Sequence, residues 1–263
     1  MPAAFSFGQV NVSGVMGSDG YSVLRARLDT GLLFVPGLNM HLKYELFQSD
    51  NMPSDMSRYA AGISYDVPFI ELLEVGAEAG WQPKANQYSN YWYDIYGSVN
   101  LHEVLFRLVP TDELKLSLGY KQTAHSFYSP DAGVRQSDIY ATLFQRTGGF
   151  DASLNFAKAV NYSGDLSQVP PWLDVPGFIF VSAGFLDYTL GANAGYTYKF
   201  IRPYAAYNFL KRKDIADTDT FGLGLTVRFA GLNVNGSVEW YNFSRNTENR
   251  ERFFSLSAGV NFL

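Results

Sequence analysis

Period-two alternation of apolar and polar residues is the feature that most constrains the fold of this chain. In the stretch 252–263, every second residue from Phe254 to Phe262 is apolar, and the residues between them are Ser, Gly or Asn. Such alternation predicts a β-strand with one apolar and one polar face. The same pattern recurs along the whole chain, mostly in segments of about ten residues, the length that crosses a bilayer at a tilt. We therefore expect an all-β protein.

Composition narrows the class of protein. Charged residues make up only 17 % of the 263 residues, below the ~25 % that is usual for soluble domains, whereas aromatic residues reach 16 %. There is no cysteine, so disulfides and thiol chemistry are excluded, and a net charge of −5 is too small to indicate a nucleic-acid partner. No apolar run approaches the ~20 residues that a membrane-spanning helix needs.

Fourteen alternating segments are predicted, and turns separate them. Short turns alternate with longer polar loops along the chain. The short turns are 36–39, 66–71, 147–149, 200–201 and 230–231; the longer loops include 49–56, 82–90, 122–135, 161–187, 211–217 and 244–251. The predicted strands are 6–16, 21–35, 40–46, 58–67, 73–81, 91–101, 114–121, 137–146, 150–156, 188–200, 202–210, 220–229, 232–240 and 252–263.

These segments predict a transmembrane antiparallel up-and-down β-barrel. Alternating short and long connections are typical of outer-membrane barrels. Aromatic residues at the ends of the apolar faces, such as Trp81, Tyr91 and Phe229, match the rings found at membrane interfaces. Backbone groups in hydrocarbon must all be paired, so the sheet must close. We predict one domain, 1–263, with 14 strands; 12 or 16 are the alternatives, and 16 would add Val104–Val109 and Phe178–Val181. A soluble sandwich or barrel is disfavoured, because its polar face would carry more Lys and Glu.

The inward faces carry the residues that would decide function. Their Gly, Ser, Thr and Asn residues predict an open interior, since 14 strands enclose more space than eight, which side chains can fill. The charges either create a field across a water-filled pore or form salt-bridge ladders that stiffen the wall, and both interpretations stay open. The predicted basic pore-lining residues are Arg25, Arg27, Lys43, Arg58, Lys115, Lys121 and Arg228; the acidic ones are Asp29, Glu45, Glu74, Glu78, Asp94 and Glu239.

The segment 161–187 is predicted to be a long extracellular loop. It is rich in Pro and apolar for an exposed loop, so it either constricts the pore or lies on the surface without a gating role. The candidate gate residues are Pro170, Pro171, Trp172, Phe178 and Phe180.

Catalysis is the less favoured interpretation. His125, Ser126 and Asp131 are predicted at the outer rim, where a lipid hydrolase would need a nucleophile, a base and an acid. Ser126 follows His125 directly, however, so the two side chains point apart in an extended strand. No catalytic residue, metal site or cofactor is assigned.

By strand number, size, terminal strand and loop asymmetry, the chain resembles the monomeric, OmpG-like fourteen-stranded outer-membrane channels. The resemblance is architectural and transfers no functional residue. It implies a porin-like channel for passive diffusion of ions or small polar solutes, embedded as a monomer among outer-membrane lipid and lipopolysaccharide. A lipid-modifying hydrolase or a barrel that scaffolds a partner protein is the alternative. Met1-Pro2 opens almost directly onto a strand, so we expect any export signal to be absent from this chain.

Overall fold

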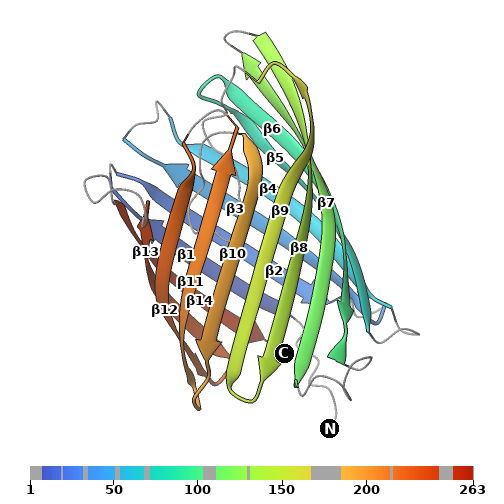
Figure 1. Cartoon of the computed structure of the whole chain (residues 1–263), viewed down its shortest axis with the longest axis vertical. Helices are drawn as coiled ribbons and strands as arrows, with labels where there is room; N and C mark the ends of the chain where they lie inside the picture. Colours follow the sequence, from blue (N-terminus) through green and yellow to red (C-terminus); the bar gives the residue numbers. More distant parts are fainter. Residues whose placement is uncertain are drawn as a thin grey trace.

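The chain folds into one closed barrel of fourteen antiparallel strands (Figure 1). The computed structural model describes residues 8–18, 20–31, 35–50, 54–67, 72–102, 111–128, 131–166, 185–213, 216–242 and 251–262. The strands are β1 Gly8–Met16, β2 Ser22–Gly31, β3 Leu38–Gln48, β4 Met56–Asp66, β5 Leu73–Ala85, β6 Tyr88–Asn100, β7 Glu113–Tyr128, β8 Asp131–Thr147, β9 Phe150–Gly164, β10 Leu186–Tyr196, β11 Ile201–Arg212, β12 Thr218–Phe229, β13 Leu232–Tyr241 and β14 Glu251–Phe262.

Closure is made by the first and last strands. β1 pairs with β14 in an antiparallel register that runs from Gly8 opposite Phe262 to Met16 opposite Phe254. Every other strand pairs with its two neighbours in the sequence. The sheet therefore has no open edge, which confirms the predicted fold class and strand number.

The outer face of the barrel is apolar. Each of the fourteen strands exposes at least one large apolar side chain, for example Val12 on β1, Leu154 on β9 and Leu256 on β14. Soluble monomers rarely expose such a continuous apolar surface, whereas a lipid-facing barrel requires it. The side chains that alternate with these residues point into the barrel, and we call them the lumenal face.

Two rings of exposed aromatic residues border the apolar face. Tyr59 and Trp81 stack with ring centroids 6.2 Å apart, and Tyr91 and Tyr93 continue this outer ring on β6. The opposite ring lies at the end where the chain terminates and contains Phe150, Tyr196, Tyr198, Phe200 and Phe229. Such rings are typical of the two membrane interfaces, so the barrel end that carries the termini is the expected periplasmic end.

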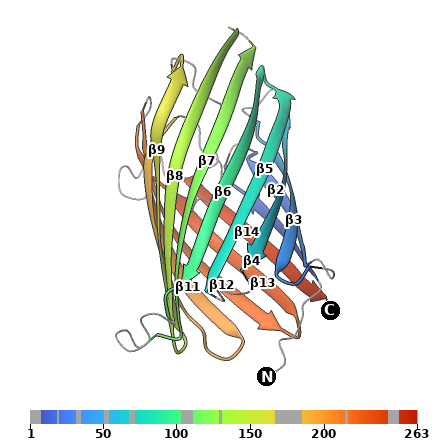
Figure 2. The same cartoon turned by 90° about the vertical axis from the view of Figure 1, so that its right-hand side faces the viewer.

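Five strands project beyond the outer ring, and this corrects two predicted loops. β5 to β9 have 13, 13, 16, 17 and 15 residues, so they form a taller wall that is visible at the top of Figures 1 and 2. The predicted loop 82–90 is a hairpin that turns at Asn86 and Gln87, whose φ angles are 52° and 61°. Residues 122–128 and 131–135 of the other predicted loop are likewise strand, in β7 and β8. Both were misread because strand segments above the membrane have no lipid-facing face and lose the apolar alternation.

The region of the predicted loop 161–187 is described only in part. β9 continues to Gly164 and β10 starts at Leu186, so both ends of the predicted loop belong to strands. Phe178–Val181 and Val104–Val109, the two additional strand candidates, lie outside the described residues, as does most of the loop. No helix among the described residues is long and apolar enough to cross a membrane.

Candidate functional site in the barrel lumen

Ion pairs connect the charged residues of the lumenal face across several strands. Arg25 on β2 donates to Glu45 on β3, with 2.9 Å between Nε and Oε1. Arg27 donates through Nε and Nη2 to Asp29, two residues along the same strand. Lys115 on β7 donates to Glu74 on β5, at 2.8 Å. The basic and acidic sectors of the wall are therefore joined by contacts, as the interpretation of salt-bridge ladders expects.

Glu78 on β5 is the centre of the largest group of contacts. Its carboxylate binds Lys43 of β3 and lies 2.7 Å from Nε2 of His41, and the indole Nε1 of Trp92 on β6 lies 3.5 Å from Oε1. The Glu78 side chain is only 14 % exposed. This carboxylate thus holds side chains from β3 and β6 in place behind the surface that faces the open lumen.

Arg58 on β4 is held between aromatic rings. Its guanidinium carbon lies 4.5 Å from the centre of the Trp92 ring and 5.9 Å from that of Phe47. Nη1 lies 3.3 Å from Oε2 of Glu45. Arg58 is buried, so the contacts fix its position in the wall and leave little of it for a solute.

The other predicted pore-lining residues are more dispersed. Asp94 accepts a hydrogen bond from the Tyr140 hydroxyl at 2.8 Å, and the ammonium of Lys121 lies 5.5 Å from the centre of the Trp92 ring. Glu239 is buried near the outer end and accepts from the Thr220 hydroxyl at 2.8 Å. Arg228 is exposed at the periplasmic end of β12.

Glycines of the lumenal face support aromatic rings of the neighbouring strand. Gly80 lies opposite Trp92 in the register of β5 and β6, and a Cβ at Gly80 would overlap the indole ring. The same arrangement recurs for Gly76 with Tyr96, Gly119 with Tyr140 and Gly224 with Tyr204. The expectation that lumenal glycines leave open space was wrong for these four, because each one accommodates a ring from a neighbouring strand.

An apolar layer, which no residue-level prediction anticipated, fills part of the outer end of the interior. Val15, Val23, Phe47, Met56 and Phe253 pack together, and none is more than 5 % exposed. They come from β1, β2, β3, β4 and β14, on the lumenal side of each strand. This layer ends the polar part of the lumen on the β14–β4 side of the barrel.

Two adjoining cavities lie below this layer. The first, of about 520 Å³, lies against β13, β14, β1, β2 and β3, and Val15 forms part of its outer boundary. The second, of about 440 Å³, continues towards the periplasmic end along β1 to β4. Asn11 and Arg27 line both cavities, so the two adjoin along this side of the lumen.

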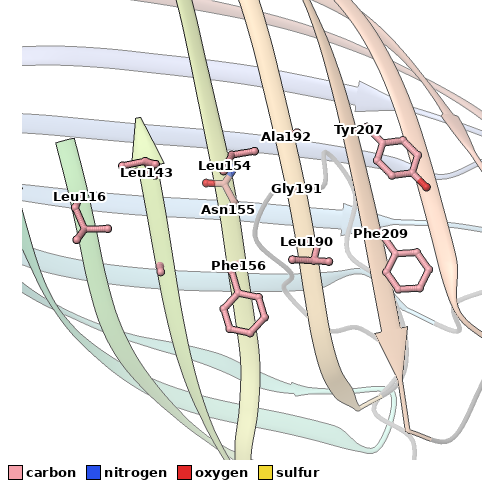
Figure 3. Close-up of a pocket in the computed structure, with 11 residues that line it drawn as sticks. Leu116, Leu143, Leu154, Asn155, Phe156, Leu190, Gly191, Ala192, Tyr207 and Phe209 are labelled. Atoms are coloured by element: carbon pink, nitrogen blue, oxygen red, sulfur yellow. The ribbon is translucent and has the colours of Figure 1, made fainter. Parts of the chain in front are cut away.

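A third cavity, of about 510 Å³, is an apolar groove on the outer face (Figure 3). Leu116, Leu143, Leu154, Phe156 and Leu190 line it, together with the small residues Ala141 and Ala192. Its position on the lipid-facing side makes it a groove for hydrocarbon, and it does not open into the lumen. The groove is therefore not part of the candidate pore.

His125 belongs to a buried, hydrogen-bonded cluster. Its ring is buried in the part of β7 beyond the outer aromatic ring, and Nδ1 lies 2.7 Å from the Tyr88 hydroxyl. Asn90 donates to that hydroxyl oxygen at 2.9 Å, which leaves the Tyr88 proton to be donated to His125. Burial lowers the pKa of His125 to about 4, and the nearby charges of Lys121 and Arg58 act in the same direction. Burial also raises the pKa of Tyr88.

Among the residues that the structure describes, no nucleophile lies beside this histidine. Ser126 lies on the opposite face of β7, as the alternation predicts, and none of the described residues offers His125 a serine hydroxyl or a carboxylate at hydrogen-bonding distance. Within the described ranges, no three His, Cys, Asp or Glu side chains come together as metal ligands. The candidate gate residues Pro170, Pro171, Trp172, Phe178 and Phe180 lie outside the described residues, and their role stays a prediction.

The lumenal ion pair of Arg202 was missed by the sequence analysis. Arg202 on β11 binds Asp151 on β9 through two donors and also donates to Asn193 on β10 at 3.2 Å. Arg202 was passed over because segment 202–210 shows weak alternation. The sequence did contain one indication that Arg202 points inward. Arg202 shares a strand face with Tyr204, two residues later, and this face is opposite the one that carries Tyr207.

No protein-family model and no curated protein matches the chain. Solved structures match it over nearly its full length. The chain is similar to the outer-membrane protein Omp33 of Acinetobacter baumannii, with 11 % identity, a TM-score of 0.53 and 98 % of each chain covered. A ΔS2 mutant of the TodX monoaromatic hydrocarbon channel also gives 11 % identity and a TM-score of 0.53, over 100 % of this chain and 93 % of that one.

A loop L8 deletion mutant of OmpT from Vibrio cholerae is similar as well, with 12 % identity and a TM-score of 0.50, over 96 % of this chain and 97 % of the other. The fold is that of the bacterial outer-membrane β-barrels. Identities this low show the fold alone. The solute must therefore be argued from the residues of this barrel.

Proposed function

We propose that this barrel is an outer-membrane channel through which ions and small polar solutes diffuse passively. The observation that carries the proposal is the pair of adjoining lumenal cavities along β13 to β4, of about 520 and 440 Å³, which share Asn11 and Arg27. Each cavity is within the ~300–1,000 Å³ range of small-molecule sites. A barrel whose interior served only stability would fill this space with side chains.

The lumenal residues explain how a polar solute would cross. Ser, Thr and Asn side chains on β1, β13 and β14 can replace part of the hydration shell of a sugar or an ion. The ion pairs on β2 to β7 hold long charged side chains against the wall, which keeps the lumen from being filled by them. Fixed charges that remain exposed set the preference for anions or cations.

The outer face supports a monomer in a lipid environment. Every strand is paired on both sides, so no edge invites a strand of another chain. The apolar face extends over all fourteen strands and suits outer-membrane lipid, with lipopolysaccharide at the outer leaflet. We infer an outer-membrane location for the same reason.

Swelling of liposomes that contain the purified barrel tests the proposal. Transfer into an isotonic glucose solution should produce swelling that protein-free liposomes do not show. Ser13→Trp should slow the swelling, because Ser13 lines the larger cavity and an indole would occupy much of it. Ser89→Trp is the control, since Ser89 is bonded to Tyr128 on the exposed wall above the membrane. Swelling no faster than in protein-free liposomes would contradict the proposed channel.

A further inference from the structure

The larger lumenal cavity has an unequal distribution of charge. Arg25, Arg27 and Lys43 line it from β2 and β3, whereas Glu45 is the one carboxylate among its lining residues. Hydroxyl and amide groups from Asn11, Ser13, Asn235, Ser255 and Ser257 also line the cavity, together with Val15, Ala26 and Tyr44. The cavity is thus cationic on one side and neutral and hydrogen-bonding on the other.

Two of the cations face each other directly. Arg27 and Lys43 are partners in the register of β2 and β3. Like charges directly opposite on neighbouring strands are destabilising. The positions beside this pair carry the short side chains of Asn11, opposite Arg27, and Ala60, opposite Lys43. A like-charge pair with short residues opposite it on both outer strands is the kind of local conflict that marks a binding site.

The compensating carboxylates lie away from the centre of the cavity. Asp29 takes the Nε and Nη2 donors of Arg27 from the periplasmic side, and the Arg27 side chain stays 44 % exposed. Glu78 reaches Lys43 from β5 and is itself 14 % exposed, while Lys43 is 33 % exposed. In each pair the cation is more exposed than its partner. A solute in the cavity would therefore meet positive charge first.

We propose that this cavity binds the acid group of a small polyhydroxylated solute, such as a sugar acid. The carboxylate would lie between Arg27 and Lys43, where both can donate charge-assisted hydrogen bonds. The hydroxyls would meet the serine and asparagine side chains of β13, β14 and β1. The inference rests on the proposed channel for its physiological meaning, because in a channel this cavity would be a binding site along the path of the solute.

Isothermal titration of the folded barrel in detergent tests the site. D-glucuronate and D-glucose are the probes, since they differ only in a carboxylate in place of a hydroxymethyl group. We expect glucuronate to bind at least about tenfold more tightly than glucose, which corresponds to about 1.4 kcal/mol. Raising the salt concentration should weaken the binding of glucuronate, because the site is open to screening ions.

Lys43→Gln and Lys115→Gln form a matched pair of variants. Both lysines bind a glutamate of β5, and their exposed fractions are 33 % and 37 %, but only Lys43 lines the cavity. Lys43→Gln should weaken glucuronate binding about tenfold and Lys115→Gln less than about twofold. Arg27→Gln provides a second variant should Lys43→Gln fail to fold, which far-UV circular dichroism reports.

Equal affinities for glucuronate and glucose, no binding of either, or equal effects of the two lysine variants would overturn the site. Failure of the channel gives a different result. If glucuronate binds as expected but the barrel passes no ions or solutes, the proposed channel is wrong and the site stands. If solutes pass but glucuronate shows no preference, the channel stands and the anion site is wrong.

Discussion

Replacing Gly80 by alanine should destabilise the barrel through the Trp92 ring. The added Cβ would overlap the indole, so the ring must move away from β5. Forcing a group into a packed site costs about 1–3 kcal/mol. The displaced ring would also lose its contact with the Arg58 guanidinium, whose carbon lies 4.5 Å from the ring centre. Such a cation–π contact contributes about 0.5–2 kcal/mol. We therefore expect a total loss of about 2–4 kcal/mol in the free energy of unfolding.

Urea unfolding followed by far-UV circular dichroism measures this loss. Gly222→Ala is the matched control, because Gly222 is also lumenal and its nearest neighbouring atoms would lie 3.7 Å or more from an added Cβ. In a Trp92→Ala background, Gly80→Ala should cost less than about 0.5 kcal/mol, since no ring remains to be displaced. The reasoning is refuted if Gly80→Ala and Gly222→Ala unfold alike, or if the cost of Gly80→Ala is unchanged without Trp92.

Three further predictions address the outer face, the wall above the membrane and the lumenal charge. Leu154→Arg should lower the free energy of unfolding in lipid by about 2–4 kcal/mol, whereas Ser153→Arg, on the lumenal face, should cost less than half of that; similar losses would contradict the assignment of faces. The pKa of His125 falls from 6.5 to about 4 on folding, because the buried ring must stay neutral. About 3 kcal/mol of the free energy of unfolding should therefore be present in full above pH 6.5 and be lost as the pH falls towards 4. Unfolding at pH 7 and pH 4.5 measures most of this loss, and His125→Asn should remove this part of the pH dependence. Glu78→Gln should release Lys43 and increase the preference of the channel for chloride over potassium, measured as a shift in reversal potential; no shift would mean that the charge of Glu78 does not reach the pore.

The fold could be predicted from the sequence because the surroundings of a membrane barrel are simple. Lipid outside and water inside require the same two-residue alternation on every strand, so Phe254, Leu256 and Val260 identify an outer face without any knowledge of their neighbours. The requirement that all backbone groups be paired then dictates closure. The even strand number and the two aromatic rings follow from the same constraint.

The tall outer wall could not be predicted in this way. Above the membrane both faces of a strand contact water or protein, so residues 82–90 and 122–135 have no alternation to detect. Their strands are held by backbone pairing, which sequence composition does not record. Asn86 was the one local indication of a turn, since Asn adopts positive φ more easily than most residues.

The sequence could predict which residues face the lumen, but it could not predict which of them contact one another. The alternation places Arg27, Lys43 and Glu78 on the lumenal face, but only the register shows that Arg27 opposes Lys43 while Glu78 reaches Lys43 from β5. The glycines were misjudged for the same reason, because the space beside Gly80 is filled or empty according to the residue opposite it on β6. Lumenal apolar residues such as Val15 were not predicted, because the alternation was expected to place polar residues inside the barrel.

Single-channel recording in planar bilayers under a tenfold gradient of KCl is the most direct test of the account. A polar lumen with a cationic cavity predicts stepwise increases in current and a reversal potential displaced towards that of chloride. Absence of current steps over many insertions would contradict the channel, and a reversal potential displaced towards that of potassium would contradict the role assigned to Arg27 and Lys43.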